Sequence, residues 1–140
     1  METRVLRILL LLAGIGIIAL GLNVGLGGIQ TLGWQGSTDF ITVSNAEQFA
    51  VQDNHIRFIA GVWAGVGLVF VLGAIKPRYF ARTLVFLCLL IALGGLFRLS
   101  AGDFALVTGF AILPSLIAEL VLFPALAVWI HRTFVHDTHR

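Results

Sequence analysis

Charged residues and cysteine are both scarce in this sequence. Asp, Glu, Lys and Arg make up 11% of the 140 residues, against about 25% in soluble domains. With 59% hydrophobic residues, the chain has too few polar groups to cover a soluble globule, whereas lipid accepts such a surface. The composition therefore excludes a soluble domain and indicates an integral membrane protein.

Motifs that would carry chemistry are also missing. The single cysteine, Cys88, lies in an apolar run, so one chain can form no disulfide, CxxC redox pair or thiolate metal cage. No Walker loop, GxSxG elbow or HExxH motif occurs. His55 and His131 flank apolar runs, and His136 and His139 follow the last run, an arrangement unsuited to haem or metal. We expect no cofactor, no metal and no nucleic acid partner.

Four apolar runs are long enough to cross a bilayer, which takes about 20 residues per helix. The predicted spans are about 5–26, 56–75, 80–98 and 110–131. They predict an all-α membrane protein, a four-helix transmembrane bundle forming a single membrane domain over residues 1–140. The first run could instead be a signal peptide, but its apolar stretch continues to Leu26 and suits a retained span better.

The distribution of basic residues predicts the orientation, because Lys and Arg concentrate on the cytoplasmic side. Arg57 and Arg98 fall on one side of the membrane. The other side receives seven basic residues: Arg4, Arg7, Lys76, Arg78, Arg82, Arg132 and Arg140. We therefore expect both termini in the cytoplasm.

The loop at 27–55 is the longest stretch outside the predicted spans and lies on the outer side. It mixes Trp34, Phe40 and other apolar residues with polar ones, which favours an ordered cap lying against the headgroups. A short helix is predicted around 46–52, with Ser44 or Asn45 as its cap. The alternative is a plain connector in which Trp34 anchors the interface.

Small residues and one proline mark expected features of the helices. Glycines recur at close intervals in the first three spans, and small residues let helix backbones approach closely. The expected packing positions are Gly21, Gly25, Gly61, Gly65, Gly94 and Gly95. Pro124 lacks a backbone donor and is expected to kink the fourth helix beside Glu119.

Glu119 is the most informative residue, because a charge inside a span costs about 2.5–3.5 kcal/mol even on a lenient scale. Arg57 begins the second span, Arg98 ends the third, and Asn23 lies near the outer end of the first. We predict that these four residues converge in the outer half of the bundle, with Ser115 one turn from Glu119 joining them. An arginine can hold a carboxylate through two parallel hydrogen bonds.

This cluster would contain two arginines and one acid, which leaves two interpretations open. The excess positive charge could attract an anionic headgroup, a carboxylate or a polar quinone ring from the outer leaflet. Alternatively, Asp53 or Asp103 from the loops could supply the second negative charge and lock the bundle.

The sequence resembles a bacterial family of small four-helix membrane proteins known only as a domain of unknown function. The likeness lies in Arg-Phe-Ile-Ala-Gly at 57–61, in Arg98 followed by Ser100 and Gly102, and in Glu119. The resemblance implies the four-helix fold, the bacterial inner membrane and a characteristic polar set, but no activity.

Three functions are compatible with these features. The first is a non-catalytic inner-membrane protein that acts as an accessory or structural subunit of a larger membrane complex. The second is a binding or transport module for an anionic or amphipathic small molecule, a lipid or a quinone, held by the Arg/Glu pocket. The third is a membrane enzyme with Glu119 as acid or base. The absence of catalytic motifs favours a protein that is not an enzyme. The expected partners are membrane lipids and a larger membrane protein complex.

Overall fold

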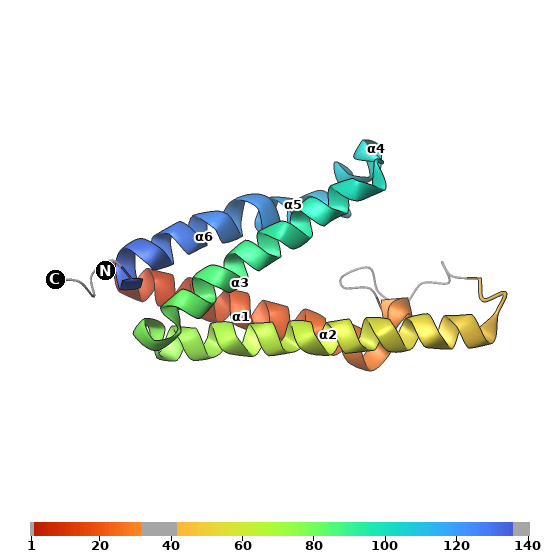
Figure 1. Ribbon diagram of the computed structural model, residues 1–140, viewed down its shortest axis with the longest axis horizontal. Coiled ribbons are helices and arrows are strands. Elements are labelled where there is room, and N and C mark those ends of the chain that lie inside the picture. The colour runs from red at the N-terminus through yellow and green to blue at the C-terminus, as the bar shows by residue number, and fades with distance from the viewer. Residues whose placement is uncertain (1, 32–41, 136–140) are drawn as a thin grey trace. The chain divides into compact units, whose positions relative to one another are not determined.

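The computed structural model describes residues 2–31 and 42–135, together with every side chain in these ranges except that of Glu2. The regular elements of the described residues are all helices, and these residues contain no strand (Figure 1). In chain order the elements are α1 (Glu2–Gly27), η1 (Ile29–Thr31), α2 (Ala46–Ile75), α3 (Pro77–Arg98), η3 (Leu99–Ala101), α4 (Phe104–Val107), α5 (Leu113–Ile117), η4 (Ala118–Leu122), α6 (Phe123–Ile130) and η5 (His131–Val135).

Four helical stretches are long and apolar enough to cross a membrane, as the runs in the sequence predict. They are Thr3–Gly27, Ala46–Ile75, Pro77–Ala101 and Leu113–Val135. The last stretch joins α5, η4, α6 and η5 into one continuous span. The chain is therefore an all-helical, multi-pass membrane protein.

The second helix begins well before its predicted start at residue 56. Asn45 caps it, accepting a hydrogen bond from the Gln48 N–H at 3.1 Å, as predicted for the short helix near residue 46. That short helix is the first part of α2, whose 30 residues extend about 45 Å, against about 30 Å for a hydrocarbon core. The first ten residues of α2, 46–55, are thus helical although many of them are polar. Of the predicted outer cap, Trp34 and Phe40 lie outside the described residues.

The helices divide between two units, Leu9–Val71 and Met1–Ile8 with Leu72–Arg140. In the unit Leu9–Val71, α1 and α2 pack through small residues. A Cβ added to Gly21 would lie 2.6 Å from the Ala64 nitrogen, and one added to Gly14 would lie 2.8 Å from the Gly67 oxygen. These distances are far below van der Waals contact, so only glycine permits the approach of the two backbones.

Five of the six predicted packing glycines divide into two groups, and the sixth, Gly95, packs against the fourth span. Gly21 and Gly25 face α2, where the nearest atom to a Cβ on Gly25 would be 3.7 Å away. Around Gly61, Gly65 and Gly94, in contrast, no described atom lies within 4 Å of an added Cβ. The contacts expected inside the bundle are therefore corrected at these three glycines, because the helix rotation turns them away from the neighbouring backbone of the chain. Gly14 and Gly67 make the close contact instead.

In the other unit, α3 packs along the fourth span, mainly against α6. Pro77 starts α3, a position where its missing N–H costs nothing. The buried face of α3 repeats at helical intervals: Ala81, Leu84, Cys88, Ile91 and Gly95. The buried residues of α6 are Phe123, Leu126, Ala127 and Ile130. These two faces hold α3 and the fourth span together and fix the positions of their polar residues.

Candidate functional site

The fourth span contains a π-helical turn at Glu119. In η4 the Phe123 N–H donates to the Ala118 oxygen, five residues back instead of four. Pro124 follows directly and has no N–H to donate to the Leu120 oxygen, so the regular α-helical bonding cannot continue through this point. The sequence predicts a kink at Pro124, and the structure has a π turn directly before this proline. Such turns often occur at functional sites.

Glu119 and Arg98 form a two-pronged ion pair within this unit. Arg98 Nε donates to Glu119 Oε2 at 2.7 Å, and the second guanidinium nitrogen donates to Oε1 at 2.8 Å. The Glu119 side chain is 14% exposed and that of Arg98 is 42% exposed. Glu119 lies about 9 Å along the axis from the start of α5 at 1.5 Å per residue. A carboxylate placed at that depth is neutralised by the arginine that ends α3.

Gly95 makes room for this pair. It lies one turn before Arg98, is buried, and faces the π turn. An added Cβ would be 2.9 Å from Glu119 Cβ and 2.9 Å from Leu120 Cδ2. The absence of a side chain at residue 95 therefore lets the carboxylate approach α3 closely enough for both prongs to form.

Arg57 has a different partner, in the unit Leu9–Val71. Its Nε donates to Asp53 Oδ2 at 2.6 Å, one turn earlier on α2. A second guanidinium nitrogen donates to the Leu26 oxygen at 2.6 Å and to the Gly25 oxygen at 3.2 Å. These carbonyls belong to the last turn of α1, where the helix dipole favours a cation. Arg57 therefore closes the C-terminal end of α1.

Asp53 extends the same arrangement to the chain after α1. Its Oδ1 accepts a hydrogen bond from the Ile29 N–H at 2.7 Å. Gly28 adopts a φ of 78°, which glycine tolerates well, and a Cβ on it would collide with the Asp53 carboxylate. This turn therefore requires both the conformation and the small size of glycine.

The remaining predicted members have other hydrogen-bond partners. The Asn23 side chain donates to the Thr31 oxygen at 3.0 Å, which fastens η1 to α1. Ser115 Oγ donates to the oxygen of Ile112, the residue just before its own helix α5, at 2.8 Å. Of the five residues expected to converge, Arg98 and Glu119 form an ion pair with each other, and Arg57 and Asn23 make hydrogen bonds within the unit Leu9–Val71.

The charge balance of the two pairs is even. Arg57 faces Asp53 and Arg98 faces Glu119, so each guanidinium has one carboxylate. Asp103 has a separate task, capping α4 by accepting from the Leu106 N–H at 2.9 Å. The excess positive charge expected from two arginines and one acid is therefore neutralised by a carboxylate one helical turn from Arg57.

Metal-binding and nucleophilic groups are dispersed in the described part of the chain. No three side chains among its His, Cys, Asp and Glu residues lie close enough together to hold a metal ion. Cys88 is buried within α3. The described part of the chain therefore offers two ion pairs, and neither of them is a metal site.

Comparison with known proteins gives one match. A family model described as a domain of unknown function, DUF4345, matches residues 5–130. The chain belongs to the DUF4345 family. The DUF4345 region includes both ion pairs, the π turn and the glycines of the α1 and α2 contact. No curated protein and no solved structure matches the chain.

Two features of this DUF4345 chain were missed in the sequence, and the place of a third was wrong. Asp53 is one of the acids expected to supply the second negative charge, but it lies on α2 and not in a loop. Its spacing of four from Arg57 is the signal of a pair on one helix face. Gly14 and Gly67 were overlooked because their neighbours are as apolar as those of the other glycines. The π turn has no specific residue signal beyond the combination of Glu119 and Pro124.

Proposed function

We propose that the chain is a non-catalytic protein of the bacterial inner membrane that acts as an accessory or structural subunit beside a larger membrane protein. The observation that carries this proposal is the neutralisation of both arginines by carboxylates of their own unit. An acid that serves as a catalyst needs a free oxygen and access to substrate. Both oxygens of Glu119 instead accept hydrogen bonds from Arg98.

An open face on α2 supports the subunit interpretation. Gly61 and Gly65 are exposed, lie four residues apart, and have no described atom within 4 Å of an added Cβ. Small residues at this spacing let a second helix approach the backbone closely in lipid. The face is flanked by exposed Phe58, Val62 and Leu68, which suit an apolar neighbour.

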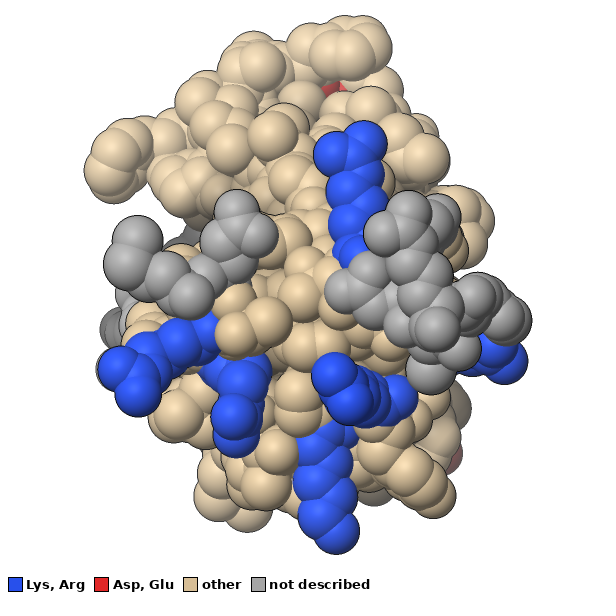
Figure 2. Space-filling view, turned by 90° about the vertical axis from the view of Figure 1, so that its left-hand side faces the viewer, with Lys and Arg blue, Asp and Glu red and all other residues tan. Residues whose placement is uncertain are grey.

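The exposed basic residues support an orientation with both termini in the cytoplasm. One end of the unit that contains α3 carries exposed cations, many of them visible in blue in Figure 2. They are Arg4, Arg7, Lys76, Arg78, Arg82 and Arg132. Basic residues at the ends of spans remain on the cytoplasmic side during insertion. A reporter that is active only in the cytoplasm should therefore be active when it is fused to either terminus.

Affinity purification from native membranes in a mild detergent tests the subunit proposal, with mass spectrometry of the proteins that copurify. A membrane protein that copurifies with the wild type and is lost with Gly61→Leu or Gly65→Leu supports it. Gly16→Leu is the matched control, because Gly16 also has open space but no small residue four positions away. Purification of the chain alone, or loss of the partner with Gly16→Leu to the same extent, contradicts it.

A second candidate is a binding module for an anionic or amphipathic molecule, a lipid or a quinone, at Arg98 and Glu119. The specific support is the π turn at Glu119 and the 42% exposure of the Arg98 side chain. In this alternative the ligand's polar group contacts Arg98 from its exposed side. A quinone or lipid that copurifies with the wild type and is lost in Arg98→Gln, while protein partners are unchanged, would favour it over the subunit proposal.

A further inference from the structure

The end of the unit where α2 stops and α3 starts has a strong excess of positive charge. We name it the basic end, and it consists of the six exposed cations Arg4, Arg7, Lys76, Arg78, Arg82 and Arg132. The described carboxylates of the same unit are those of Asp103 and Glu119. Asp103 follows the far end of α3, and Glu119 contacts its last residue. The basic end therefore lacks a described acidic side chain to compensate its charge.

Arg7 already has a structural task at this end. Its Nε donates to the Ala74 oxygen at 2.7 Å, and a second guanidinium nitrogen lies 3.4 Å from the Ile75 oxygen. These are carbonyls of the last turn of α2, whose partial negative charge attracts a cation. Arg7 thus holds the turn between α2 and α3 in place for the basic residues that follow.

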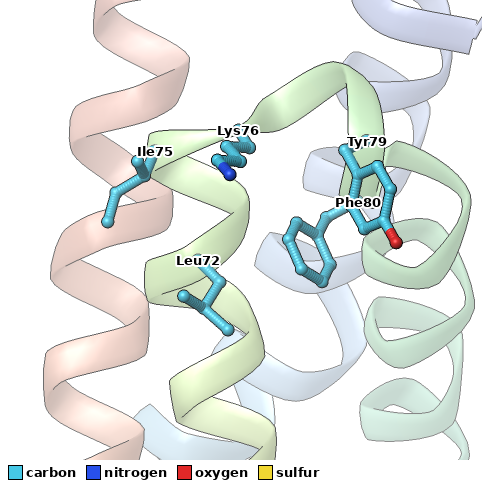
Figure 3. Close-up of a pocket in the computed structure, with 5 residues that line it drawn as sticks. All are labelled: Leu72, Ile75, Lys76, Tyr79 and Phe80. Atoms are coloured by element: carbon cyan, nitrogen blue, oxygen red, sulfur yellow. The ribbon is translucent and has the colours of Figure 1, made fainter.

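A cavity of about 300 Å³ opens at this turn. It is lined by Leu72, Ile75, Lys76, Tyr79 and Phe80 (Figure 3). The lining side chains are apolar or aromatic except for Lys76, and Tyr79 also carries a hydroxyl group. The Tyr79 and Phe80 rings pack edge to face with their centres 4.9 Å apart, and this contact supports one wall.

The combination of one ammonium group with apolar walls fits an amphipathic anion better than a free one. Figure 3 shows Lys76 above a space whose sides are formed by Leu72 and Phe80. A phosphate at Lys76 would place the glycerol and first acyl carbons of a phospholipid against these apolar side chains. Arg78 and Arg82 follow on the first turns of α3 and are exposed, so they add to the positive field at the headgroup.

We propose that the turn between α2 and α3 is a binding site for one anionic phospholipid, whose headgroup phosphate is held by Lys76. The acyl end of the glycerol occupies the cavity between Leu72 and Phe80. The site is independent of the Arg98 and Glu119 pair, and it predicts that the basic end faces the leaflet richer in anionic lipid.

In the test, the purified full chain is placed in mixed vesicles of phosphatidylglycerol and phosphatidylcholine. Native mass spectrometry then measures which lipid the chain retains. We expect the wild type to retain phosphatidylglycerol in preference to phosphatidylcholine. Lys76→Gln should weaken this preference about tenfold, because the hydrogen bond from a charged donor to the phosphate is lost, and Arg4→Gln should weaken it less. Arg4→Gln is the control, because it removes the same charge at the same end and Arg4 does not line the cavity. Lys76→Arg should restore the preference.

A neutral variant separates the cavity from the general field. Phe80→Ala removes one wall without changing charge, and it should also lower retention of phosphatidylglycerol. Circular dichroism and gel filtration establish whether each variant is folded. If Phe80→Ala does not fold, the comparison of Lys76→Gln with Lys76→Arg still tests the site. Equal effects of Lys76→Gln and Arg4→Gln would overturn the proposal in favour of a diffuse field. Displacement of the lipid by excess inorganic phosphate would overturn it in favour of a free-anion site.

Discussion

Replacement of Glu119 by Gln tests the ion pair inside the fourth span most directly. Gln has the same shape but no charge. In the wild type both carboxylate oxygens accept from Arg98, at 2.7 and 2.8 Å. The amide keeps one acceptor and turns the other prong into a donor facing a guanidinium N–H, so one hydrogen bond is lost and the arginine charge is left unpaired.

The expected cost follows from the exposure of the two side chains. Removing one partner costs about 3–5 kcal/mol in a buried pair and about 0–1 kcal/mol in an exposed one. Glu119 is 14% exposed and Arg98 is 42% exposed, so the freed arginine regains part of its hydration. We expect a loss of about 2 kcal/mol, which for a chain of this size lowers the melting temperature by roughly 4–8 °C.

The assay is thermal unfolding of the purified chain in mild detergent, followed by tryptophan fluorescence and by gel filtration of heated samples. Glu47→Gln is the matched control, because Glu47 is exposed in the first turn of α2. Its loss should cost no more than about 1 kcal/mol. In the double variant with Arg98→Gln, the loss should be smaller than the sum of the two single losses. A Glu119→Gln curve that matches the control, or strictly additive losses, would refute the reasoning.

Three further changes test other parts of the structure. Gly95→Ala should cost about 1–3 kcal/mol by overpacking, because its methyl group would lie 2.9 Å from a side chain of η4. Gly94→Ala, with open space, should keep or slightly raise the melting temperature. Asp53→Asn should slightly lower the melting temperature because it removes the charge facing the 38% exposed Arg57, and an unchanged melting curve would count against this pair. Cys88 should react with a permeant maleimide much more slowly in the folded chain than after denaturation, because it is fully buried, and fast labelling of the folded chain would contradict that burial.

The four spans could be predicted because hydropathy and length suffice to identify apolar helices. The start of α2 could not, because hydropathy marks where a helix enters lipid and not where it begins. Residues 46–55 are polar yet helical, and Asn45 caps them. Treating them as a loop also concealed that Asp53 and Arg57 lie one turn apart on the same helix.

A side-chain pair could be predicted from the sequence only where one side chain had few possible partners. Glu119 is short and lies inside an apolar run, so an arginine at the same level was the natural partner, and Arg98 holds that position. Arg57 is long and near a helix end, so several acids and carbonyls were available to it. The choice among glycines depended on helix rotation, which the spacing of small residues alone does not determine.

The π turn in the fourth span holds one residue more than an α-helical turn would. Each helical residue advances about 100° around the axis, so the segment before Glu119 is out of phase with the segment after Pro124 by that angle. A chain shortened by one residue here would keep its apolar composition and nearly all of its hydrophobic length. It would nevertheless rotate the Glu119 carboxylate away from α3. The ion pair is therefore sensitive to a deletion at this point, although the hydropathy of the span is not.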